Sequence, residues 1–236
     1  MIATNIRKKA REALAGKWSK GAIITFILML IIVSINLLTV KLVKDNIIVA
    51  NILSGILTFV SVPLGLGTTY AFIKLKRNEE VKVLDFIKLA FTNFVKSWSL
   101  MVATIIKMIL PIICIIVGIV LFVIMACSSY KISFGLLVVG VIVYLAAMVY
   151  AVVIGLRYTL SYYISYDNAN INAFEAVNES ARLMKGHKGD YFVLILSFLG
   201  WAIISVLTFG IGLLWLIPYM QTATVCFYDE ILEKNK

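Results

Sequence analysis

The chain has 236 residues, of which 62% are hydrophobic and only 14% are charged, and its mean hydropathy is +1.01. Soluble domains are about half apolar and about a quarter charged, so this composition excludes an ordinary soluble fold and indicates a membrane protein. The net charge of +10 would suggest nucleic-acid binding in a soluble protein. Basic residues that hold loops in the cytoplasm explain it better, and we expect no nucleic-acid partner.

Six apolar runs follow one another along the chain. A helix needs about 20 apolar residues to cross a hydrocarbon core about 30 Å thick. The predicted spans cover about 22–43, 47–73, 99–126, 134–160, 191–208 and 211–228. The fourth run can be extended to Tyr166, and only Phe209 and Gly210 separate the last two. The sequence therefore predicts an all-α polytopic bundle of six transmembrane helices, forming a single membrane domain over residues 1–236.

Basic residues gather in alternate gaps between these runs. Eighteen of the 22 Lys and Arg residues lie before the first span, between the second and third, between the fourth and fifth, or after the sixth. The opposite loops contain only Lys41, Lys44 and Lys131. Because basic loops stay in the cytoplasm, we expect a multi-pass protein with both its N-terminus and its C-terminus in the cytoplasm.

Three segments on the predicted cytoplasmic side combine helical spacing of apolar residues with a basic face. They cover about 3–15, 81–98 and 170–185. Asn172 and Glu175 fit a capping box, and Gly16 and Gly186 fit stop positions after the first and third segments. These patterns predict three amphipathic helices lying in the membrane interface, each preceding a pair of spans.

This order suggests a threefold internal repeat, in which each unit has an interfacial helix, a span outward and a span back. Pro63 and Thr69 in the second span have the same spacing as Pro218 and Thr224 in the sixth. The fourth span has Thr159 at the equivalent place but no proline. The units would cover residues 1–77, 78–168 and 169–236.

Several blocks of the sequence resemble one family of bacterial integral membrane proteins. The blocks are Ala10–Trp18, Ser180–His187, Phe192–Trp201 and Thr208–Tyr219. They are similar to the family called domain of unknown function 975, which is found mainly in Gram-positive bacteria. The resemblance covers nearly the whole chain and implies a location in the bacterial cytoplasmic membrane. It implies no activity and no binding residues, because none is established for the family.

Lys107 is the only charged residue well inside a predicted span. Placing a lysine at the centre of a membrane costs about 2.5–3.5 kcal/mol on insertion scales, so it is a candidate functional residue. The alternative is that its long side chain reaches the membrane surface or a backbone carbonyl. No Asp or Glu lies within a span to pair with it, so both interpretations stay open.

Proline occurs three times, at Pro63, Pro111 and Pro218, and always inside a predicted span. Each proline is expected to kink its helix and to leave one carbonyl without a partner. Kinked helices can gate a transport path or can fit curved packing. Packing is the simpler explanation.

A set of basic residues around the fourth and fifth spans forms the second candidate site. It comprises Arg157, Arg182, Lys185, His187 and Lys188, which we expect to contact lipid headgroups. A single histidine cannot form an HExxH motif, and neither a Walker A nor a GxGxxG motif occurs. The three cysteines form no CxxC pair. We therefore expect no metal, no cofactor and no enzymatic activity.

The first functional hypothesis is a non-enzymatic membrane factor that engages anionic lipids, a membrane-protein partner or another copy of itself. Such a factor would support envelope homeostasis or protection against membrane-active peptides. The alternative is a small transporter or an accessory permease subunit, and the least favoured is a lipid-modifying enzyme. A continuous polar cavity around Lys107, Asn36, Asn51 and Gln221 would favour transport.

Overall fold

A computed structural model describes residues 2–45, 47–127 and 134–235. Within these residues twelve helices form and no strand. Lys131 lies outside the described residues, and the side chain of Lys44 is not described. The helices are α1 (Ile2–Leu14), α2 (Trp18–Asp45), α3 (Ile47–Lys76), α4 (Asp85–Thr92), α5 (Phe94–Lys107), α6 (Ile109–Cys127), α7 (Phe134–Leu156), α8 (Ser161–Asp167), α9 (Ala173–Leu183), α10 (Lys188–Leu196), α11 (Leu199–Leu207) and α12 (Leu213–Lys234).

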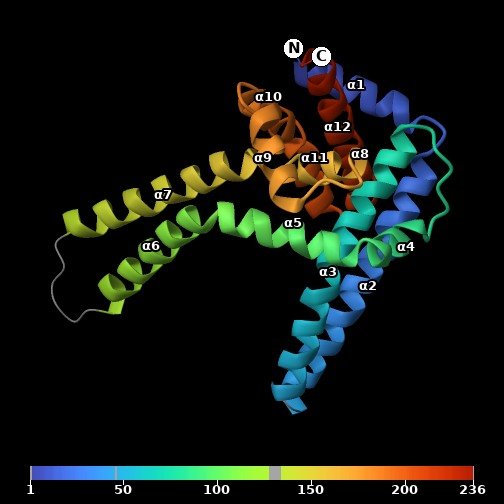
Figure 1. Ribbon diagram of the computed structural model, residues 1–236. Helices are drawn as coiled ribbons and strands as arrows, with labels where there is room; N and C mark the ends of the chain where they lie inside the picture. Colours follow the sequence, from blue (N-terminus) through green and yellow to red (C-terminus); the bar gives the residue numbers. More distant parts are fainter. Residues whose placement is uncertain (1, 46, 128–133, 236) are drawn as a thin grey trace.

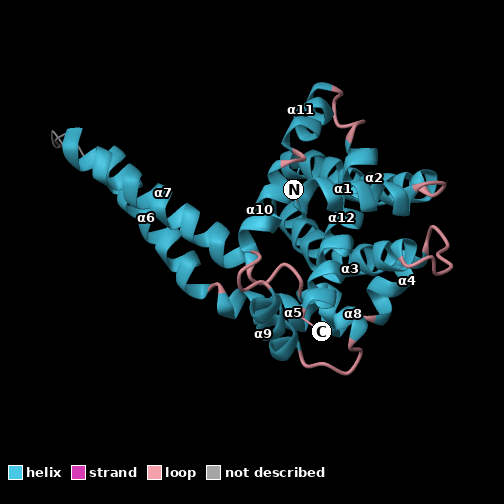
Figure 2. Cartoon of the chain, turned by 90° about the horizontal axis from the view of Figure 1, so that it is seen from above, coloured by secondary structure: helices cyan, strands magenta, loops and turns pink. Residues whose placement is uncertain are grey.

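Two long hairpins project from a body of packed helices (Figure 1). One hairpin is α2 with α3, the other is α6 with α7, and they point in different directions from the body. Viewed from above, the α6–α7 hairpin extends by itself, away from the other helices (Figure 2). Both termini lie at the end of the molecule opposite the tip of the α2–α3 hairpin (Figure 1).

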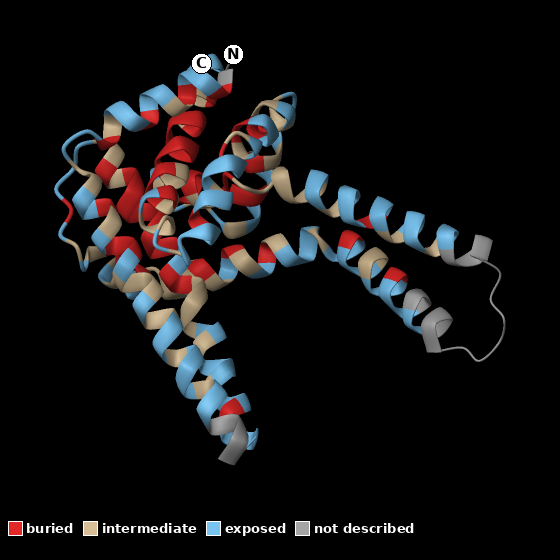
Figure 3. Ribbon diagram, turned by 180° about the vertical axis from the view of Figure 1, so that it is seen from behind, coloured by how far each residue is buried: buried red, intermediate tan, exposed pale blue. Residues whose placement is uncertain are grey.

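The outer surfaces of the hairpins are apolar and exposed, whereas buried residues concentrate in the body (Figure 3). Leu37 on α2 is 66% exposed, and Val149 on α7 is 64% exposed. Exposed apolar surface on this scale is unusual in a soluble protein and is what a helix presents to lipid tails. The described residues include four segments long and apolar enough to cross a membrane: Trp18–Lys41, Ile47–Lys76, Val138–Asp167 and Lys188–Leu207.

The six expected spans are not all found as single apolar helices. The expected third span is interrupted at Met108, where α5 ends and α6 begins, and Pro111 occupies the first turn of α6. A proline is tolerated there because first-turn amides have no helical partner. Helices α4 and α5 would count as a fifth span, bent by 69°. Helix α12 contains the expected sixth span but is not among the apolar segments, since polar residues such as Gln221 and Asp229 lower its hydropathy.

The apolar faces of two expected interfacial helices are buried inside the protein. On α1, Ile6, Ala10 and Leu14 are 0–1% exposed, and the helix packs against α10 and α12. Helix α9 buries Val177 and Leu183, and it packs against α5 and α8. These two helices therefore present mainly their polar faces to the surroundings, together with Phe174 of α9, which is 42% exposed.

The third expected interfacial helix, over 81–98, is divided into α4 and α5 at Asn93. It packs against α3 through Phe86 and Ala90, which are fully buried. Phe91 and Val95, which belong to its expected apolar stripe, stay 57% and 76% exposed. This segment therefore keeps apolar side chains on its outer surface.

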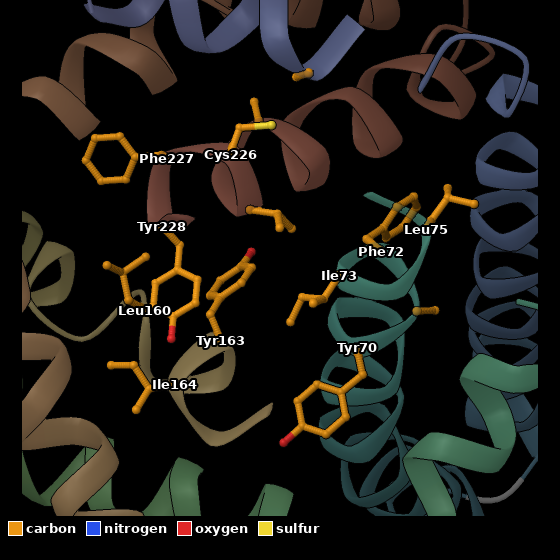
Figure 4. Packing of buried hydrophobic residues seen from close by; sticks show 14 of the residues in the cluster. Tyr70, Phe72, Ile73, Leu75, Leu160, Tyr163, Ile164, Cys226, Phe227 and Tyr228 are labelled. Carbon is orange, nitrogen blue, oxygen red and sulfur yellow. The ribbon is translucent and has the colours of Figure 1, made fainter. Parts of the chain in front are cut away.

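The core lies where the second half of α3 meets α8 and α12 (Figure 4). The rings of Tyr163 on α8 and Tyr228 on α12 are 5.7 Å apart, and the Tyr70 hydroxyl on α3 lies 2.7 Å from Ser165 Oγ. The three segments that close the proposed repeat units thus converge on one cluster of buried residues. Their charged ends emerge together from that cluster.

Candidate lipid-headgroup site

Local structure fixes the segment that carries the five predicted basic residues. The capping box at the start of α9 is confirmed: the Phe174 amide donates to Asn172 Oδ1 at 3.2 Å, and the Asn172 amide donates to Glu175 Oε2 at 3.3 Å. Gly186 follows α9 with φ +86°, a left-handed conformation that glycine adopts without strain. The chain turns there and enters α10 at Lys188.

Ser180 joins α9 to the backbone that carries Arg157. The Ser180 hydroxyl donates to the Arg157 carbonyl at 2.8 Å and accepts from the Leu160 amide at 3.1 Å, and Ser180 is fully buried. The Arg157 guanidinium lies 6.0 Å from the centre of the Tyr158 ring. Arg157 has no carboxylate partner among the described residues.

An apolar groove of about 460 Å³ lies between α7 and α10. Val149, Val153 and Leu156 on α7 face Lys188 and Phe192 on α10. Lys188 lines the groove, and Arg157 directly follows the lining residue Leu156 in the chain. Neither has an ion-pair partner in the described structure. An apolar groove with a cation in its lining matches the apolar and charged parts of an anionic amphiphile.

The other three predicted residues are not part of this groove. Arg182 is paired with Glu179, with Nη2 2.5 Å from Oε1, and this hydrogen bond lowers the pKa of the Glu179 carboxyl. The His187 Nδ1 atom lies 3.5 Å from Asp190 Oδ2. Lys185 is exposed and has no partner in the described structure. The structure therefore places Lys188 in the groove lining and Arg157 next to a lining residue in the chain, and it gives Arg182 and His187 partners of their own.

Lys107 is the last residue of α5 and is exposed, with no hydrogen bond or ion pair in the described structure. Its neighbours Ile105, Ile106 and Ile109 are 43–55% exposed, so its surroundings are apolar. Within the described residues, no hydrogen bond or ion pair joins any two of Lys107, Asn36, Asn51 and Gln221. Asn36 donates to the Ile32 carbonyl of its own helix, and Gln221 accepts from Tyr163.

The three prolines are buried, Pro63 in α3, Pro111 in α6 and Pro218 in α12. Pro218 packs closely against α2. A Cβ atom added at Gly21 on α2 would lie 3.0 Å from the Cβ atom of Pro218. This contact favours packing as the role of Pro218.

One ion-pair network was not predicted from the sequence. Arg77, just after α3, binds Asp167 at the end of α8 at 2.5 and 3.1 Å, and Asp229 on α12 at 3.0 Å. Lys76 also pairs with Asp229, and the Tyr228 hydroxyl donates to Asp167 at 3.0 Å. The hydrogen bond to Asp167 raises the pKa of Arg77. The sequence does offer a signal for this network. Asp167 and Asp229 lie near the ends of α8 and α12, and the basic residues Lys76 and Arg77 lie at the end of α3.

No group of three His, Cys, Asp or Glu residues in the described part of the chain could hold a metal ion. Cys114 and Cys226 are free thiols, and the Cys127 side chain is not described.

An all-helical chain with several long apolar helices and wide apolar outer surfaces belongs to the class of helical membrane proteins. The family model described as "Protein of unknown function (DUF975)" matches residues 1–235, and the chain belongs to that family. The expected family is thereby confirmed. No curated protein and no solved structure matches the chain.

Proposed function

We propose that the protein is a non-enzymatic, multi-pass protein of the bacterial cytoplasmic membrane that binds anionic lipid headgroups on its cytoplasmic face. Both termini would lie in the cytoplasm, and the protein would support envelope homeostasis or protection against membrane-active peptides. The observation that carries this proposal is the apolar α7–α10 groove, whose lining includes Lys188 and whose residue Leu156 is followed by Arg157. Neither cation has an ion-pair partner in the described structure. Each basic residue near an anionic membrane contributes about 1 kcal/mol of attraction.

The burial of α1 and α9 defines how lipid would be engaged. Because their apolar faces pack inside the protein, these helices would touch the membrane through charged side chains and would not insert. Headgroups, and not acyl chains, would be the ligands of the outer face of α1, whereas Arg182, the one basic residue of α9, is already paired with Glu179.

In this proposal the chain crosses the membrane six times, in three pairs of helical segments. The third crossing would be broken at Met108, the fifth would comprise α10 and α11, and the sixth would be the part of α12 that ends at Tyr228. Helix α12 can tolerate polar residues because it is surrounded by protein, with Tyr219, Ala223 and Phe227 buried. The convergence of α3, α8 and α12 on one core and one ion-pair network supports the threefold plan.

Lipid competition tests the proposal. Protein purified in detergent is equilibrated with equal amounts of phosphatidylglycerol and phosphatidylcholine, and the lipids retained are counted by native mass spectrometry. We expect the wild type to retain phosphatidylglycerol in excess. Replacing Arg157→Gln and Lys188→Gln together removes two contributions of about 1 kcal/mol each, which would reduce that preference at the groove about 30-fold.

Arg182→Gln is the matched control, because Arg182 is already paired with Glu179. It should keep the preference for phosphatidylglycerol. Equal retention of both lipids by the wild type, or an unchanged preference in the double variant, would contradict the proposal.

A further inference from the structure

A second cavity, of about 440 Å³, lies between the junction of α1 with α2 and the helices α11 and α12. Its lining includes Trp18, Trp201, Trp215, Ile204 and Tyr219. Three of the four tryptophans of the chain therefore surround one cavity. Its volume falls in the range of about 300–1,000 Å³ that is usual for small-molecule sites.

The wall of this cavity is held in place by close contacts. The Trp18 and Tyr219 rings meet edge to face with centres 5.9 Å apart. The Tyr219 hydroxyl donates to the Arg7 carbonyl at 3.2 Å and accepts from Arg7 Nε at 3.4 Å. A Cβ at Gly212 would lie 2.7 Å from Ser205 Oγ, so α11 and α12 meet as closely as their backbones allow. These contacts hold the part of the wall that Trp18, Tyr219 and the α11–α12 junction form.

The cavity is accessible from the apolar outer surface. Trp201 and Trp215 are 52% and 51% exposed. Ile203, Leu207 and Ile211, on the same two helices and their connection, are 55–73% exposed. An acyl chain in the surrounding lipid would therefore reach the tryptophans without crossing a polar barrier.

Arg11 is the charged residue of the lining, and its guanidinium is free to bind a ligand. The other three cations of α1 have partners: Arg7 donates to Tyr219, Lys8 pairs with Glu12, and Lys9 pairs with Glu230. Arg11 is exposed and has no hydrogen bond or ion pair in the part of the chain that the structure describes. Guanidinium binds phosphate through two parallel hydrogen bonds, which makes arginine well suited to a phosphate group.

We propose that this cavity binds one anionic phospholipid, whose acyl chain lies against Trp18, Trp201 and Trp215 and whose phosphate is bound by Arg11. The combination of an apolar, aromatic wall with a single unpaired cation argues against a cationic peptide, and the missing internal partner of Arg11 argues against a neutral lipid. The inference rests on the proposed contact with anionic lipid and adds a second, separate site with its own residues.

Tryptophan fluorescence provides a direct test. In a Trp98→Phe background every remaining tryptophan lines the cavity, because Trp98 stacks on Phe59 elsewhere. The protein is placed in phosphatidylcholine nanodiscs that contain a fixed fraction of either dibrominated phosphatidylglycerol or dibrominated phosphatidylcholine. Bromine quenches tryptophan only at short range. We expect stronger quenching by the brominated phosphatidylglycerol.

Arg11→Gln should remove this difference and lower the apparent affinity for phosphatidylglycerol about tenfold, as expected for the loss of one charge-assisted contact. Arg11→Lys should restore part of it. Lys8→Gln, on the same helix and also exposed, should leave quenching unchanged. Equal quenching by the two lipids, or an undiminished difference in Arg11→Gln, would overturn the inference.

The two proposed sites can be contradicted independently of each other. If Arg157→Gln with Lys188→Gln reduces phosphatidylglycerol retention while Arg11→Gln leaves quenching intact, the proposed function stands and the tryptophan-lined site does not. If the Arg11 variant alone changes quenching, the tryptophan-lined site stands and the α7–α10 groove does not.

Discussion

Two glycines separated by one residue show how a single side chain decides the packing of α3. Gly65 and Gly67 are both small enough to allow close helix approach, but they lie two residues apart in a helix that turns by about 100° per residue, so the two face different directions. A Cβ at Gly67 would lie 2.2 Å from the Phe86 carbonyl oxygen and 2.7 Å from the Ala90 amide, whereas nothing lies within 4 Å of a Cβ at Gly65. The sequence could show that small residues were present, but not which of them meets a neighbour.

We expect Gly67→Ala to destabilise the protein by about 1–3 kcal/mol or more, because the obstructing atoms are backbone and cannot move aside. Gly65→Ala should change stability by less than about 1 kcal/mol, and could raise it slightly through better helix propensity. Thermal unfolding in detergent compares the two variants. A Gly67→Ala protein as stable as the wild type would contradict the close α3–α4 contact.

Lys107 is expected to face lipid and to reach the membrane surface with its side chain, since its neighbours are exposed isoleucines. Lys107→Cys should therefore react poorly with a membrane-impermeant thiol reagent, and Lys107→Met should preserve folding and lipid preference. Rapid labelling of Lys107→Cys from the aqueous side would indicate a water-filled path and would favour the transporter alternative.

At the scale of helices, the ends of α3, α8 and α12 are joined by Arg77. Its side chain and that of Asp167 are 28% and 23% exposed, so the pair is intermediate between a surface and a buried ion pair. Hydropathy and helical periodicity predicted the spans that contain α3 and α12, and they reached α8 only as an extension of the fourth span to Tyr166. They contain no information on which charge at one helix end meets which charge on another, more than 60 residues away.

We expect Arg77→Gln and Asp167→Asn each to cost about 1–3 kcal/mol, since each leaves a charged partner without its hydrogen bonds. The double variant should cost less than the sum of the two, because the second change removes a group that has already lost its partner. Chemical or thermal unfolding of the wild type, the two single variants and the double variant completes this double-mutant cycle. Additive effects would show that the two residues do not interact.

The contact between α1 and α12 should be sensitive to acid. Burial opposes the charge of Glu230, but hydrogen bonds from Lys9 and Lys234 outweigh it and hold the pKa of Glu230 below its ordinary value. A carboxyl with a lowered pKa stabilises the fold above its unfolded pKa of about 4.3, and this contribution is lost as the pH falls through the folded pKa.

Glu230→Gln should therefore lower the free energy of unfolding at pH 7 by about 0.2–1 kcal/mol. This is the range for an exposed ion pair, and it applies because the Lys9 side chain is 45% exposed. Below pH 4 the variant and the wild type should converge. Melting temperatures measured between pH 3.5 and pH 7 test this, and a constant difference across that range would contradict the assigned ion pair.

The helix breaks at Met108 and between α10 and α11 were not predicted from the sequence, because a hydropathy window averages over a whole span. One turn residue between apolar neighbours changes that average very little. Helix ends with a specific chemical signal were predicted more closely: Gly16 and Gly186 have φ of +72° and +86°, and the Asn172–Glu175 box forms as expected. Local chemistry was therefore more informative about boundaries than average hydropathy.

At the scale of the whole molecule, the sequence predicted an all-helical membrane protein but not the contact of its amphipathic helices with the body. An apolar stripe can face lipid or protein, and the choice depends on whether another helix offers a complementary surface. Helices α10 and α12 do so for α1, and α5 and α8 do so for α9. The candidate headgroup site was predicted in part for the same reason: Lys188 and Arg157 were named, but the groove that Lys188 lines exists only once α7 and α10 pack together.

The central claim is that the basic segments share the cytoplasmic face of one membrane. Side-specific labelling of single cysteines tests it most directly, in a background in which Cys114, Cys127 and Cys226 are replaced by alanine. Three cytoplasmic positions are probed by Lys8→Cys, Lys82→Cys and Lys185→Cys, and two opposite positions by Lys41→Cys and Phe209→Cys. All five side chains are exposed. We predict that an impermeant maleimide labels the first three only in inside-out vesicles and the last two only in right-side-out vesicles. Labelling of Lys8→Cys, Lys82→Cys or Lys185→Cys from the outer face would contradict the account.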